Sequence, residues 1–121
     1  MNSNKYNSDK EAYRISQLML DKKALDITIM DVRKITTLTD FFIVCTSESE
    51  PQTRAITDHI NEKMKEEGIK SWHTEGYQNL EWVLIDFVNI VVHIFSKNAR
   101  EYYEFERLWA DCDITHVKED K

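Results

Sequence analysis

Apolar and polar residues along residues 82–95 alternate in a pattern typical of a β-hairpin. With a turn at residues 88 and 89, strand alternation gathers one set of apolar side chains on a single face. This face, predicted to be core, carries Val83, Ile85, Phe87, Ile90, Val92 and Ile94. The other face carries Trp82, Leu84, Asp86, Val91, His93 and Phe95, with Trp82 across from Phe95. Its two ionisable residues among large apolar ones favour a surface that a partner covers part of the time, so we predict a docking face.

Apolar stripes and runs elsewhere predict three helices and three further strands. The helices cover residues 8–23, 49–67 and 98–111, and the strands cover residues 26–32, 41–46 and 70–74. The strand at 41–46 is apolar enough to be buried on both faces. Three residue pairs are spaced to cap the helix starts: Ser8 with Glu11, Ser49 with Gln52, and Asn98 with Glu101. Gly68 is expected to end the second helix.

These elements follow one another in the order α-β-β-α-β-β-β-α. The strand–helix–strand step across residues 41–74 favours a parallel pair, whereas the final hairpin is antiparallel. We therefore predict a protein of the α/β (α+β) class, with a mixed five-stranded sheet flanked by helices. A chain of 121 residues accommodates one domain, placed at residues 8–113. Residues 1–7 are expected to form a flexible tail and residues 114–121 a solvated one.

Composition and charge narrow the classes of partner. The formal net charge of -6 disfavours a nucleic-acid binder, which usually carries a basic patch, and suits a basic protein partner. The first ten residues have no apolar core of a secretion signal, and no apolar run approaches membrane-spanning length. Cys45 and Cys112 have no metal-like spacing and are read as reduced thiols. These observations favour a cytoplasmic protein that does not bind membranes.

Candidate catalytic groups are dispersed along the chain. Acidic residues stand near strand ends, and the alternative to a binding protein is a magnesium-dependent nucleotidyltransferase-like enzyme that uses Asp40, Glu75 and Asp86. Paired carboxylates on one strand beside a phosphate-binding turn are missing from the pattern, so we predict neither a catalytic residue nor a metal or other cofactor. The four histidines fall on four different elements: His59, His73, His93 and His116. For His93 two interpretations stay open, a docking residue or a core histidine satisfied by Asp86 or a main-chain carbonyl.

The last predicted helix is rich in aromatic residues. Tyr102, Phe105 and Trp109 follow helical spacing and are expected to pack in the core. Tyr103 falls on another side with Arg100 and Arg107, and tyrosine and arginine are typical anchors of protein interfaces. The helix is therefore predicted to pack with one face and to bind with another.

An ordered set of short motifs resembles the Iojap-like ribosomal silencing factor family, called RsfS in bacteria. The motifs extend from about residue 24 to residue 111. They are Asp31-Val32, residues 39–45 (TDFFIVC), Ser49 with Gln52, residues 54–56 (RAI), residues 75–77 (EGY), residues 82–86 (WVLID), residues 91–95 (VVHIF), and Arg100, Tyr103, Leu108 and Trp109. Thr46, Glu81 and Val88 stand where glycine is common in the family.

The resemblance implies a translation repressor without enzymatic activity. Members bind the large ribosomal subunit through a basic protein of its intersubunit face, number fourteen in bacterial nomenclature, and thereby block association with the small subunit when nutrients are scarce. The family fold is similar to that of nucleotidyltransferases without their active site, and members are often dimeric in isolation. We predict partner contacts by Trp82, Asp86, His93, Phe95, Arg100, Tyr103, Glu106 and Trp109. A homodimer through the same face is the third alternative.

Overall fold

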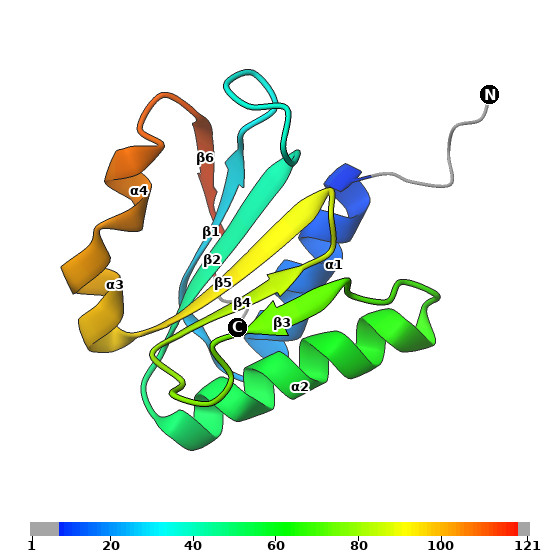
Figure 1. Ribbon diagram of the computed structural model, residues 1–121, viewed down its shortest axis with the longest axis vertical. Coiled ribbons are helices and arrows are strands. Elements are labelled where there is room, and N and C mark those ends of the chain that lie inside the picture. Colours follow the sequence, from blue (N-terminus) through cyan, green and yellow to red (C-terminus); the bar gives the residue numbers. More distant parts are fainter. Residues whose placement is uncertain (1–7, 119–121) are drawn as a thin grey trace.

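The computed structural model describes residues 8–118, so the tail predicted at residues 1–7 and the last three residues lie outside the described residues. Ten elements follow one another (Figure 1). They are α1 (Ser8–Asp21), β1 (Leu25–Asp31), β2 (Phe41–Ser47), α2 (Glu50–Glu66), β3 (His73–Glu75), β4 (Trp82–Asp86), β5 (Ile90–Ser96), α3 (Lys97–Tyr103), α4 (Phe105–Leu108) and β6 (Asp113–His116). The predicted class and the order of the first seven elements are confirmed.

The strands form one mixed sheet in the order β3-β4-β5-β2-β1-β6. Within residues 8–118, one pair of neighbouring strands is parallel, β2 with β5, where Phe41 lies beside Ile90, and the other neighbours are antiparallel. The parallel partner expected for β2 was β3, and this expectation is wrong. With three residues, β3 is too short and too polar for the centre of a sheet, and it pairs with β4 at the edge. The mostly buried β5 takes the central position instead.

The predicted count of five strands is wrong because Asp113–His116 pairs with β1 as a sixth strand. The tail expected from residue 114 therefore begins inside a strand, although all four side chains of β6 are exposed. A short edge strand of this kind carries no apolar run, and its pairing is set by the open edge of β1.

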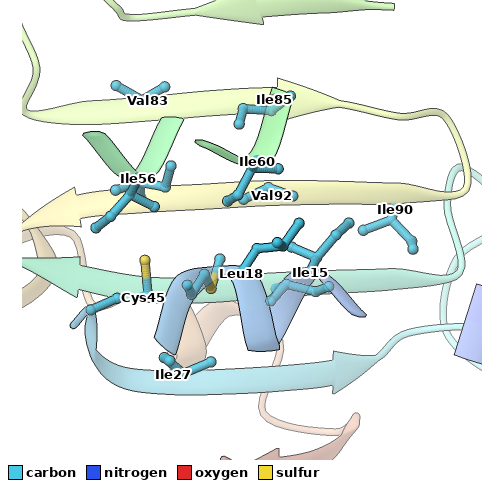
Figure 2. Packing of buried hydrophobic residues seen from close by; sticks show 14 of the residues in the cluster. Ile15, Leu18, Ile27, Cys45, Ile56, Ile60, Val83, Ile85, Ile90 and Val92 are labelled. Atoms are coloured by element: carbon cyan, nitrogen blue, oxygen red, sulfur yellow. The ribbon is translucent and has the colours of Figure 1, made fainter. Parts of the chain in front are cut away.

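One face of the sheet is covered by α1 and α2, and α3 and α4 lie on the other side (Figure 1). Ile15 and Leu18 of α1 and Ile56 and Ile60 of α2 point at the strands, as Figure 2 shows. All six hairpin residues predicted to face the core are buried, and Trp82 pairs with Phe95 as expected. Every residue of β2 is buried, which confirms a strand covered on both faces.

The predicted helix ends agree with the structure at α2 and differ at the last helix. Ser49 Oγ accepts from the Gln52 N–H at 3.2 Å, and Gly68 follows the helix at a φ of +89°. The helix predicted over residues 98–111 is instead two short helices, because Glu104 adopts a left-handed backbone conformation (φ 46°) between them. Its cap is Ser96, whose Oγ accepts from the Ala99 N–H at 3.1 Å, and not Asn98.

Candidate docking surface

The outer face of the sheet, opposite α1 and α2, is only partly covered. Phe105 at the start of α4 is buried, with its ring centroid 4.4 Å from that of His93 and 5.3 Å from that of Phe42. It also packs on Phe95, at 5.8 Å. The break at Glu104 turns the chain so that this one aromatic closes the middle of the outer face. The predicted core position of Phe105 is confirmed.

The predicted docking residues of the hairpin lie at two depths. Trp82 and Asp86 are half-buried, whereas Phe95 is fully buried and His93 is 4% exposed. Phe95 and His93 therefore lie beneath the surface and support the residues above them. Tyr103 is 45% exposed and packs on Trp82, with ring centroids 4.9 Å apart.

On the last helices, the predicted core stripe is only partly confirmed. Tyr102 is 79% exposed, so its expected core position is wrong. The change of direction at Glu104 shifts the helical phase between Tyr102 and Phe105. Trp109 is half-buried and contacts Phe42 edge-on, with ring centroids 4.8 Å apart.

His93 is a neutral core histidine with one unsatisfied nitrogen. Its Nδ1 accepts from the indole N–H of Trp82 at 3.0 Å. Burial among aromatic rings lowers the pKa of His93 to about 3. The partner is neither of those predicted: Asp86 instead accepts from the Val88 N–H at 2.7 Å in the hairpin turn. Nε2 of His93 has no partner among the described residues.

Arg100 and Glu106 form a largely buried ion pair on the same side of the sheet. The Arg100 guanidinium also donates to the main-chain oxygen of Asp26 at 3.0 Å and to Thr46 Oγ1 at 2.9 Å. The pair therefore ties α3 and α4 to β1 and β2. Both were predicted as partner contacts, but with 14% and 30% of their side chains exposed they serve first to hold this layer in place.

A groove of about 530 Å³ lies beside the covered part of the outer face. Half-buried Leu84, Val91 and Trp109 line it together with the exposed Leu38 and Trp72. Leu38 is 85% exposed and Trp72 is 73% exposed. Neither was among the predicted site residues, because Leu38 falls in a predicted turn and Trp72 in a predicted strand. Single apolar residues at a surface are common, so the sequence alone carries no signal that these two lie at one groove.

Each carboxylate of the alternative enzyme already has a protein partner, although Glu75 and Asp86 line the same groove. Asp40 accepts from the Ser8 hydroxyl at 2.9 Å, and Glu75 pairs with His73 at 2.8 Å. Within residues 8–118, no group of three or more histidine, cysteine or acidic residues is placed to hold a metal ion. Cys45 and Cys112 are free thiols. No helix in the same range is both long and apolar enough to span a membrane.

The fold and this surface define a small α/β protein with a partly covered, apolar and acidic face. Comparison with known proteins gives its family. The family model described as "Ribosomal silencing factor during starvation" matches residues 5–121. Ribosomal silencing factor RsfS of Halalkalibacterium halodurans is 41% identical over 98 residues, covering 81% of this chain and 84% of that protein. RsfS of Bacillus subtilis is 38% identical over 97 residues, covering 80% and 82%.

A solved structure has the same fold. The crystal structure of a Chromobacterium violaceum protein superposes with a TM-score of 0.80 at 32% identity, covering 93% of this chain and 95% of that one. The chain belongs to the ribosomal silencing factor family. The family predicted from the sequence motifs is confirmed.

Proposed function

We propose that this protein represses translation by binding a basic protein on the intersubunit face of the large ribosomal subunit, number fourteen in bacterial nomenclature. Bound there, it sterically blocks association with the small subunit. Membership of the silencing family supports a ribosomal target. The mechanism requires no chemical step. We place the protein in the cytoplasm, where ribosomal subunits meet.

The observation that carries this proposal is the uncovered outer face of β4. Trp82, Leu84 and Asp86 follow one another along β4. Tyr103 of α3 packs on Trp82 at one end, and Trp72 lines the groove with Leu84 and Asp86 at the other. These five residues are the docking surface. Clustered exposed apolar side chains are unusual on a monomer and mark interaction sites. With a chain charge of -6, the surface suits a basic partner, and the opposite charges speed encounter and set orientation.

The predicted site residues take different roles in this proposal. Tyr103 and Trp82 are the aromatic anchors, and Asp86 supplies negative charge beside them. Trp109 forms a wall of the groove. His93 and Phe95 support Trp82 from below, and the Arg100–Glu106 pair holds α4 in place. The protein is expected to bind no nucleic acid in a sequence-specific way and no membrane.

Replacing Tyr103 by alanine is expected to weaken binding to purified large subunits by at least about tenfold, because aromatic anchors dominate interface energies. The measurement is co-sedimentation over a range of protein concentrations. Tyr13→Ala is the matched control: Tyr13 is 61% exposed on α1, the helix packed on the opposite face. It should pellet like the wild-type protein.

Circular dichroism of both variants should match the wild-type spectrum, since neither tyrosine is buried. Equal pelleting of the Tyr103→Ala, Tyr13→Ala and wild-type proteins would remove Tyr103 from the binding surface. A wild-type protein that never pellets with large subunits would refute the proposed target.

A further inference from the structure

Two buried polar atoms that lack hydrogen-bond partners among residues 8–118 belong to residues at the groove. They are Nε2 of His93 and Oγ1 of Thr39, and both residues line the groove. The third such atom in residues 8–118, Oδ1 of Asn61, belongs to α2 and not to the groove. Buried polar groups are almost always paired, because an unpaired one has lost its hydration and gained nothing. Two of them in one groove point to a ligand that supplies the missing partners.

The hydrogen bond from Trp82 fixes which partner His93 requires. The Trp82 indole can only donate, so Nδ1 of His93 must be the unprotonated nitrogen. The single proton of the neutral ring is then on Nε2, which is a donor. His93 lines the groove, and Nε2 is its unpaired nitrogen within the described part of the chain. The ligand must offer an acceptor to His93, and the Thr39 hydroxyl takes either a donor or an acceptor.

The rest of the groove selects an apolar group beside a positive one. Its walls include Phe42, Leu84 and Val91, and Glu75 and Asp86 add two carboxylates. None of the described residues that line it is a lysine or an arginine. The His93 donor is uncharged, the groove lining is largely apolar, and acidic groups lie nearby. This combination suits the main-chain carbonyl of an apolar residue that has a basic residue next to it in sequence.

We propose that the groove receives an extended segment of the basic ribosomal protein, so this inference rests on the proposed function. An apolar side chain of the segment enters between Leu84 and Trp72. A main-chain carbonyl accepts from His93 Nε2–H, and the adjacent peptide group bonds Thr39. A lysine or arginine beside the apolar residue faces Glu75 and Asp86. Nε2 of His93 and Oγ1 of Thr39 both lie below the surface, so the proposal requires the wall of the groove to shift as the segment binds.

Thr39→Val tests the inference, because it removes the hydroxyl and keeps the shape. We expect binding to purified large subunits to weaken about 3- to 10-fold, the range for one uncharged hydrogen bond. The midpoint of thermal unfolding should stay the same or rise, because this hydroxyl has no partner within residues 8–118 to lose. Thr57→Val is the control: Thr57 is a buried threonine of α2 whose hydroxyl donates to the Thr53 carbonyl at 2.8 Å. It should bind like the wild-type protein.

Two substitutions of His93 separate the effect of losing the Nε2 hydrogen-bond donor from the effect of losing the imidazole ring. His93→Gln keeps an N–H group where Nε2 stands, whereas His93→Leu has none. Both lose the ring and its contacts with Phe42 and Phe105, so both are compared at a temperature where circular dichroism shows them folded. The glutamine variant should bind large subunits about 3- to 10-fold more tightly than the leucine variant.

The outcomes separate this inference from the proposed function. If the wild-type protein pellets and Tyr103→Ala pellets less, but Thr39→Val and His93→Leu pellet normally, the target stands and the groove inference is overturned. If Thr39→Val converts a wild-type dimer to a monomer in light scattering without changing pelleting, the occupant is a second copy, which also overturns it. A wild-type protein that does not pellet refutes the target itself and the segment with it.

Discussion

Replacing Arg100 by alanine is expected to lower the free energy of unfolding by about 2–3 kcal/mol, the upper part of the range for hydrogen bonds to a charged group. The loss is smaller than for a fully buried ion pair, because solvent reaches part of both side chains. Glu106 would keep its charge at 30% side-chain exposure without its guanidinium partner. Thr46 Oγ1 and the Asp26 carbonyl would lose a donor. Denaturant unfolding followed by circular dichroism measures the loss.

Arg107→Ala is the control for the Arg100 variant. Arg107 is 81% exposed and pairs with Glu104 one helical turn away, and such surface pairs contribute little. Its removal should leave the denaturant midpoint of unfolding unchanged, because solvent screens an exposed pair. Equal, small effects of the two substitutions would show that the Arg100–Glu106 pair does not hold α4 on the sheet.

Lowering the pH from 7 to 5 is expected to reduce the free energy of unfolding by about 2 kcal/mol through His93 alone. Burial depresses the pKa of His93 from 6.5 to about 3 in the folded protein. Between pH 6.5 and about 3, His93 is therefore protonated in the unfolded chain and neutral in the folded protein. The stabilising contribution of neutral His93 to the free energy of unfolding is therefore complete above pH 6.5 and is lost as the pH falls towards 3.

Urea unfolding at half-unit pH intervals from 5 to 7 measures this dependence. Between pH 7 and pH 5, the free energy of unfolding of the His93→Gln variant should fall by about 2 kcal/mol less than that of the wild-type protein. Parallel pH profiles for the two proteins would mean that His93 takes up its proton in the folded state, and the account of a neutral donor at Nε2 would then be wrong.

Elements set by local sequence were predictable. The hairpin register follows from strict alternation across residues 82–95, and α2 from Ser49 and Gly68 at its ends. The position of β3 in the sheet and the existence of β6 were not, because both depend on which sheet edges other strands leave open. A polar strand of four residues has no signal of its own until β1 is in place beside it.

The same distinction explains the site. Aromatic and acidic residues on one hairpin face were visible in the sequence, and the proposed docking surface includes Trp82 and Asp86 from that set. Their depth was not visible, because Phe95 and His93 are covered by Phe105 only when the chain turns at Glu104. Nor does any periodic pattern place Leu38 or Trp72 at the groove, since two loops distant in sequence bring them together.

The most direct measurement of steric silencing is subunit association in a sucrose gradient. Purified small and large subunits are mixed with increasing amounts of the wild-type protein. The account predicts that assembled ribosomes decline as the protein appears in the large-subunit fraction, and that Tyr103→Ala requires at least about tenfold more protein for the same decline. Full assembly of ribosomes while the protein is bound to their large subunits would contradict it.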